Sequence, residues 1–229
     1  MENYNQEKLG NEIGEHSPSS RELIESEINL RRQIEEVAAE SHALPREGKI
    51  MEDYVFEEKD AEGNTRQVML SDLFEEGKNS LMIYSLKFSD KGKPLYEGCN
   101  SIADGINRMV FYAEQRVKIV IVGNTSIDKL NEWAKTNGWD NLNLLSSAKN
   151  KYNSNYHGDN KKRNQLPILN VFRKTEDGIY HFYATELLFA PKEKELKKSD
   201  ADTIWPLWNL FDLIPDELGA NWNSKLSYR

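Results

Sequence analysis

Two short apolar runs with an amphipathic helix pattern between them constrain the fold of this chain most. Residues 80–86 (SLMIYSL) and 117–122 (VKIVIV) have the length and composition of strands buried in a sheet. Between them, one helix face is formed by Ile102, Ala103, Ile106, Met109, Val110 and Ala113. This strand–helix–strand order predicts two parallel strands joined by a right-handed crossover.

The remaining patterns predict further elements around this unit. Residues 54–56 and 67–70 flank an acidic, glycine-containing turn, which predicts a β-hairpin. Ser126 is a favourable N-cap for a helix at 127–137, and Gly138 follows at the expected helix end. Further predictions are strands at 142–145, 168–173 and 179–184, a long polar surface loop at 146–165, and an aromatic-rich helix at 203–214. This order of elements predicts an α/β fold with a mixed sheet flanked by helices.

The N-terminal part of the chain has a different character. Residues 1–19 are polar and are predicted to form a flexible arm. An added helix is predicted at 20–43, where apolar residues recur at helical spacing up to Pro45. This helix either packs on its own domain or pairs with a second copy, since its apolar stripe has some heptad character. We expect a single domain at 20–219 and a C-terminal tail at 220–229.

The net charge of −8 and the single cysteine narrow the classes of function. An acidic domain repels phosphate backbones, so nucleic-acid binding is not expected. No stretch approaches the roughly 18–20 apolar residues of a membrane helix, and the polar first residues lack the apolar centre of a signal peptide. One cysteine forms no disulfide framework within the chain. These features favour a cytoplasmic protein with no membrane partner.

Short motifs in a fixed order carry a resemblance to a known family. They are ALPR at 43–46, DYVF at 53–56, LSDLF at 70–74, EGCNSIADG at 97–105, NGW at 137–139, SS at 146–147 and FDLIP at 211–215. Over roughly residues 21–219, the chain resembles a mostly bacterial thioredoxin-like family of unknown function. Its members are often described as predicted dithiol-disulfide oxidoreductases. The resemblance implies a thioredoxin-like sheet with a C-x-x-C motif before the first core helix.

Only one cysteine of that motif is present, Cys99. Aligned without gaps, Cys99 matches the second, resolving cysteine, and Tyr96 replaces the attacking one. With a three-residue deletion, Cys99 matches the first cysteine instead. In either alignment a dithiol cycle within the chain is impossible, because it needs two thiols. The preceding strand also departs from the family, with Ser85 and Lys87 where relatives commonly have His and Met.

Cys99 is the candidate catalytic residue. At a loop-to-helix junction, unpaired N–H groups and the positive end of the helix favour the thiolate and lower a thiol pKa. A lone thiolate can form a sulfenic acid with peroxide or a mixed disulfide with a small thiol, and an outside thiol then reduces it. The alternative is that Cys99 is a small buried apolar residue. The chain is therefore either a one-cysteine oxidoreductase or a noncatalytic thioredoxin-fold binding or scaffold protein.

Three further residues are candidate substrate-binding groups near Cys99. Tyr96 is either a hydrogen-bond donor to a ligand or a loop aromatic that covers the sheet edge. Pro167 precedes a strand where thioredoxin-like folds have a cis proline, which implies a groove for a peptide or thiol ligand; the alternative is an ordinary proline at the start of a strand. Asp104 is either a buried proton acceptor or a solvated acid.

Other ligands are not expected from the sequence. The four histidines show no metal-ligand spacing, so neither a metal nor a cofactor is predicted. The aromatic surplus of residues 203–214, which includes Trp205, Trp208 and Phe211, exceeds what one helix stripe needs. That surplus suggests a homodimer.

Overall fold

The computed structural model describes residues 18–43, 48–86, 88, 97–156 and 168–184, with the side chains at 18–21 and 97–99 not described. The chain separates into two units, Met1–Pro45 and Arg46–Arg229. The predicted N-terminal arm, the last helix at 203–214 and the tail at 220–229 lie outside the described residues.

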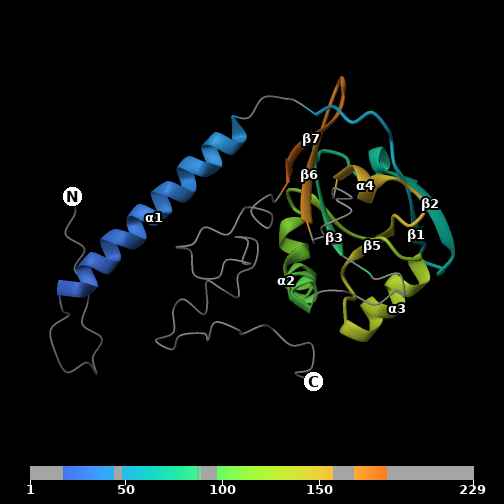
Figure 1. Cartoon of the computed structure of the whole chain (residues 1–229), viewed down its shortest axis with the longest axis horizontal. Helices are drawn as coiled ribbons and strands as arrows, with labels where there is room; N and C mark the ends of the chain where they lie inside the picture. Colours follow the sequence, from blue (N-terminus) through green and yellow to red (C-terminus); the bar gives the residue numbers. More distant parts are fainter. Residues whose placement is uncertain (1–17, 44–47, 87, 89–96, 157–167, 185–229) are drawn as a thin grey trace. The chain divides into compact units, whose positions relative to one another are not determined.

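A seven-stranded mixed sheet forms the centre of the second unit (Figure 1), in the order β2-β1-β5-β4-β3-β6-β7. The strands are β1 Val55–Lys59, β2 Thr65–Met69, β3 Ser80–Leu86, β4 Lys118–Gly123, β5 Asn143–Ser146, β6 Ile168–Thr175 and β7 Gly178–Ala184. Strand β3 pairs parallel with β4 and antiparallel with β6, and the central strand β4 also pairs parallel with β5. The hairpins β1–β2 and β6–β7 complete the two sides of the sheet.

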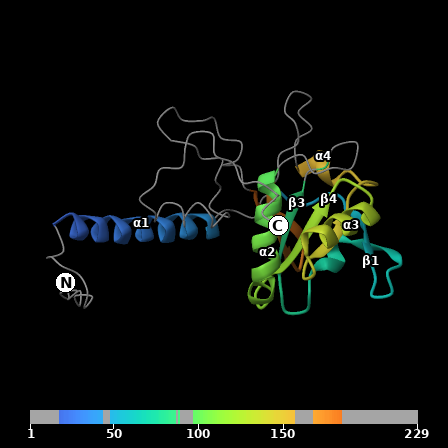
Figure 2. The same cartoon turned by 90° about the horizontal axis from the view of Figure 1, so that it is seen from below.

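Helices connect the parallel strands. Helix α2 (Glu97–Ala113) follows β3 and leads into β4, and α3 (Ile127–Asn137) connects β4 to β5. These two helices lie side by side on the sheet (Figure 2). A short 3-10 turn η1 (Leu70–Leu73) follows β2, and a short helix α4 (Tyr152–Tyr156) follows β5. Two parallel crossovers plus a terminal antiparallel hairpin make this a thioredoxin-like α/β fold, as the sequence predicts.

The sheet separates two apolar cores, because successive strand residues point to opposite faces. Tyr84 and Leu86 of β3 face the core that α2 and α3 cover. Leu81 and Ile83 face the other core, which β1, η1 and α4 complete. Fully burying one such apolar side chain contributes about 1.5–3 kcal/mol relative to its exposure. Both faces of β3 are therefore buried, which explains why its sequence is mostly apolar.

Most predicted elements agree with the structure, although some of their bounds differ. The strand at 80–86 and the helix at 127–137 have the predicted bounds. The Ser126 hydroxyl accepts a hydrogen bond from the Lys129 N–H, and Gly138 ends the helix with φ of 70°. The long polar loop predicted at 146–165 is wrong in part, because α4 forms within it. Tyr152 in α4 is fully buried, so a contact with a distant core, not the local sequence, stabilises this turn.

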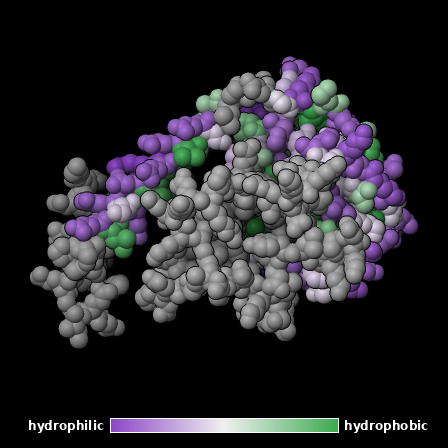
Figure 3. All heavy atoms as spheres, viewed as in Figure 1, coloured by the Kyte–Doolittle hydropathy of each residue, from purple (hydrophilic) through white to green (hydrophobic). Residues whose placement is uncertain are grey.

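The first unit contains α1 (Pro18–His42), which corresponds to the helix predicted at 20–43. Most of its apolar residues are exposed, and they alternate with hydrophilic ones along the helix (Figure 3). Across the described parts of the chain, none of the helices combines the length and apolarity that a bilayer span requires.

Alanine substitutions at Gly123, the last residue of β4, and at Gly105, within α2, give a matched test of packing. A Cβ at position 123 would lie 3.0 Å from the Phe88 ring and 3.1 Å from Leu130, both buried. We expect Gly123→Ala to lower the free energy of unfolding by about 1–3 kcal/mol through overpacking. A Cβ at Gly105 meets nothing within 4 Å, so Gly105→Ala should raise it by about 0.5–1 kcal/mol, as in any helix interior. Urea unfolding measures both, and equal effects would contradict the packing.

Candidate functional site

The three parallel strands end along one edge of the sheet. β3 ends at Leu86, β4 at Gly123 and β5 at Ser146. Ligands of α/β sheets bind beyond the carboxyl ends of such strands, because loops and helix N-termini gather there. Since α2 follows β3 and returns to the start of β4, α2 begins at this same edge. We call the first turn of α2 and the loops after β4 and β5 the carboxyl edge.

Cys99 lies in the first turn of α2 at the carboxyl edge, two residues after the helix begins at Glu97. The sequence predicted a helix only after Cys99, and this bound is corrected, because the apolar pattern marks the buried face and not the first turn. Backbone N–H groups in a first turn have no acceptor within their own helix. Tyr96, Pro167 and the side chain of Cys99 lie outside the described parts of the structure.

Hydrogen bonds from tryptophan indoles join α2 to α3 and the residues after it. The Trp133 Nε1–H donates to Asn100 Oδ1 at 3.2 Å, and the Trp139 Nε1–H donates to Asp104 Oδ1 at 2.6 Å. Asn100 is buried, whereas Asp104 is exposed. The carboxylate of Asp104 therefore faces solvent while it anchors the buried Trp139 ring.

The same side of α2 has a third contact at Asn107, which is also buried. Its Nδ2 donates to the Gly138 carbonyl at 3.1 Å, and its Oδ1 accepts from the Asn141 N–H at 3.0 Å. Positions 100, 104 and 107 share one side of a helix because they are spaced by four and three residues. We call this row of contacts the α2–α3 seam. It fixes the first turn of α2 relative to α3.

The chain that leaves β3 is also held at the carboxyl edge. The Phe88 N–H donates to Asn124 Oδ1 at 3.1 Å. The Phe88 ring is buried against Gly123, where the absence of a side chain makes the close approach possible. Residue 88 therefore has a defined position at the start of the connection that leads to α2.

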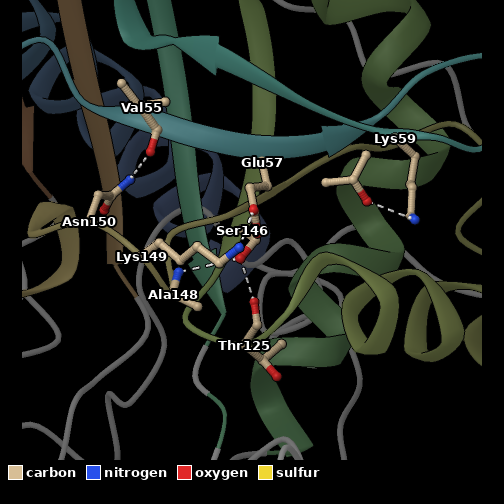
Figure 4. Close-up of polar contacts among 9 residues, drawn as sticks. Val55, Glu57, Lys59, Thr125, Ser146, Ala148, Lys149 and Asn150 are labelled. Carbon is tan, nitrogen blue, oxygen red and sulfur yellow. Dashed lines mark hydrogen bonds and ion pairs between the residues drawn. The ribbon is translucent and has the colours of Figure 1, made fainter.

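The adjacent serines at the end of β5, Ser146 and Ser147, join two loops of the carboxyl edge. The Ser146 hydroxyl donates to the Thr125 carbonyl at 2.6 Å and accepts from the Ala148 N–H (Figure 4). The Ser147 hydroxyl donates to the Gly123 carbonyl at 3.2 Å and accepts from Asn153 Nδ2. Both hydroxyls are buried and satisfied by these partners. Their role in this geometry is to hold the ends of β4 and β5 together.

An ion pair and an amide contact attach the same loop to β1. Lys149 forms an ion pair with Glu57, and Asn150 Nδ2 donates to the Val55 carbonyl at 2.7 Å (Figure 4). Lys149 is largely exposed, so its ion pair contributes little beyond orientation. Across the described residues, no group of three or more His, Cys, Asp and Glu side chains is arranged to hold a metal ion.

A buried polar network crosses the opposite face of the sheet. Asn170 Nδ2 donates to the Tyr152 hydroxyl at 3.2 Å, and Asn170 Oδ1 contacts His181 Nε2 at 2.9 Å. Burial raises the pKa of Tyr152 far above its ordinary value, while the Asn170 and Ser85 side chains partly oppose that shift. The network of hydrogen bonds therefore connects α4 to β6 and β7.

The residues that organise this region were not predicted from the sequence. Asn100, Asn107 and Asn170 are buried polar side chains on elements that were predicted from their apolar pattern alone. A usable signal was present for the helix, because asparagines at positions 100 and 107 interrupt its otherwise apolar side at a spacing of seven. No comparable signal marks Tyr152, whose partners lie in β3 and β6.

Comparison with models of known protein families identifies one family that matches this chain. Bacterial proteins of unknown function, the family DUF899, match residues 8–226. The chain belongs to this family. No curated protein matches its sequence.

Solved structures with similar backbones include thioredoxin-like and peroxiredoxin proteins. A thioredoxin-like protein from Porphyromonas gingivalis has 15% identity and a TM-score of 0.40, over 59% of this chain and 80% of that one. Prx3 from Vibrio vulnificus has 11% identity and a TM-score of 0.42, over 69% and 96%. Prx1a from Plasmodium yoelii has 16% identity and a TM-score of 0.46, over 79% and 100%. These are similarities of backbone only.

The buried phenol of Tyr152 gives a pH-dependent prediction. Its pKa is higher in the folded chain than the value of about 10 in an unfolded one, so its contribution to stability is complete below about pH 10 and is lost as pH rises further. Tyr152→Phe should lower the free energy of unfolding by about 1–3 kcal/mol at pH 8, because Asn170 loses its acceptor. The substitution should also reduce the decrease in the free energy of unfolding above about pH 10.

Urea unfolding at pH 8 and pH 11 measures both effects. Tyr112→Phe is the control, since Tyr112 is 75% exposed on α2. A Tyr152→Phe variant that behaves like this control at both pH values would contradict the network.

Proposed function

We propose that this chain is a one-cysteine, thiol-dependent oxidoreductase. The observation that supports this most is the backbone position of Cys99 in the first turn of α2, at the edge where parallel strands end. A thiolate there is favoured by unpaired N–H groups and the positive helix end, which promotes nucleophilic attack. The seam and the Phe88–Asn124 contact fix the elements on either side of the connection to α2.

The proposed reaction uses outside thiols in place of a second cysteine. Cys99 reacts with a disulfide or a hydroperoxide, and small thiols restore it. This corresponds to a degenerate C-x-x-C motif in either alignment. Tyr96 and Pro167 are proposed contacts for a thiol or peptide ligand, and Asp104 stays a predicted substrate-binding residue. A cytoplasmic location is also a proposal, because reducing thiols are supplied there.

The pH dependence of alkylation tests the proposal. Because the chain has one cysteine, iodoacetamide incorporation reports on Cys99 alone, and Cys99→Ser gives the background. We expect the rate to rise with a midpoint at least about one unit below the free-thiol value of about 8.5. A midpoint near that value, with slow modification at pH 7, would contradict the oxidoreductase and favour the noncatalytic binding or scaffold protein.

We further propose that α1 pairs with a second copy of itself. Leu23, Leu30 and Val37 are spaced by seven residues, Ile34 lies on the same side, and each is more than half exposed. Such a stripe is typical of a two-stranded coiled coil, which buries it against its copy.

Sedimentation of the full chain at micromolar concentration tests this pairing, with a dimer expected. Leu30→Glu combined with Ile34→Glu should weaken the dimer at least about tenfold, because charges replace the apolar contact. Arg32→Glu places the same side chain on the opposite side of α1 and should leave the dimer intact. A wild-type monomer would contradict the proposal.

A further inference from the structure

Two buried asparagines on α2 differ in how well their amides are satisfied. Asn107 is 3% exposed, and both ends of its amide have partners in the seam. Asn100 is 1% exposed, and its Oδ1 accepts from Trp133. Its Nδ2 is fully buried and has no hydrogen-bond partner within the described structure. The amide of Asn107 thus has partners for both its donor and its acceptor, whereas the amide of Asn100, on the same side of the helix, has a spare donor.

A spare donor of this kind is unfavourable unless something binds it. Leaving a buried N–H group unsatisfied costs about 1–3 kcal/mol, and native structures contain few such groups. Its position indicates where the acceptor would lie. Helical side chains lean toward the N-terminus of their helix, so the Asn100 amide leans toward the first turn of α2. Trp133 holds the carbonyl end of that amide, which leaves Nδ2 as the free end.

We propose that Asn100 Nδ2 and the first-turn N–H groups of α2 bind the oxygen atoms of a hydroperoxide substrate. This rests on the proposed thiol function of Cys99. An amide N–H is a good donor to oxygen, whereas disulfide sulfur is a weak acceptor. The spare donor therefore favours the peroxide reaction over thiol–disulfide exchange.

In the proposed reaction, the Cys99 sulfur is oxidised and the peroxide is reduced. The Cys99 thiolate attacks one peroxide oxygen, an S–O bond forms, and the O–O bond breaks. Sulfur is oxidised by two electrons to sulfenic acid, and the leaving oxygen departs as alcohol or water after taking a proton from solvent. Asn100 donates to the leaving oxygen, where negative charge develops. One small thiol then forms a mixed disulfide and releases water, and a second restores the Cys99 thiol and leaves as the disulfide.

Substitutions at positions 100 and 107 separate this role from a structural one. Asn100→Asp keeps an oxygen acceptor for Trp133 and removes the spare donor, and Asn100→Leu removes the donor without adding charge. Asn107→Asp is the matched control, because it removes a donor that already has a partner in Gly138. In the full chain, Cys99 modification by hydrogen peroxide and by iodoacetamide is followed by mass spectrometry above the thiol midpoint of each variant.

Both Asn100 variants should lose at least about tenfold in the peroxide rate relative to the alkylation rate, since one donor to a developing oxyanion contributes that much or more. Asn107→Asp should melt at a lower temperature and keep the wild-type ratio of the two rates. An unchanged ratio in the Asn100 variants, or an equal fall in Asn107→Asp, would overturn the inference.

The reactions of the wild-type chain with the two reagents distinguish a failure of this inference from a failure of the proposed function. If Cys99 is alkylated with a depressed midpoint but does not react with peroxide, the role of Asn100 is overturned and the thiol function stands. If neither reagent modifies Cys99 readily near neutral pH, both proposals are overturned.

Discussion

The parallel pairing of β3 with β4 is the constraint on which the rest of the second unit depends. Six residue pairs from Leu81 to Leu86 align these strands, and the connection between them must then cross one face of the sheet. That crossover is α2, so the helix must begin where β3 ends. The position of Cys99 at the carboxyl edge follows from strand pairing, and it does not depend on how the cysteine side chain itself is oriented.

The α2–α3 seam converts this topology into a defined local geometry. Apolar packing alone would leave a helix free to slide or rotate by small amounts, because it is not directional. Indole and amide hydrogen bonds are directional and connect residues more than thirty positions apart. Asn100 is the member of the seam nearest the start of α2, and it is also the one with a spare donor. In the proposed peroxide site, the Trp133–Asn100 hydrogen bond that fixes the start of α2 thus also orients Asn100 Nδ2.

The opposite face of the sheet shows a different use of buried polar groups. Asn170 connects Tyr152 and His181 beneath a layer of aromatic rings. These contacts attach α4 to β6 and β7.

The amino-acid sequence was sufficient to predict the strand at 80–86 and the helix at 127–137 with its Ser126 and Gly138 ends. It was also sufficient to exclude an internal dithiol cycle, because the chain has one thiol. Apolar periodicity and capping are local properties, and a count of cysteines needs no structure. Tertiary structure decided that Tyr152 is buried, that Asp104 anchors Trp139 while facing solvent, and that Asn100 differs from Asn107. Those properties arise from partners distant along the chain, and the type of a residue does not specify which distant atom it meets.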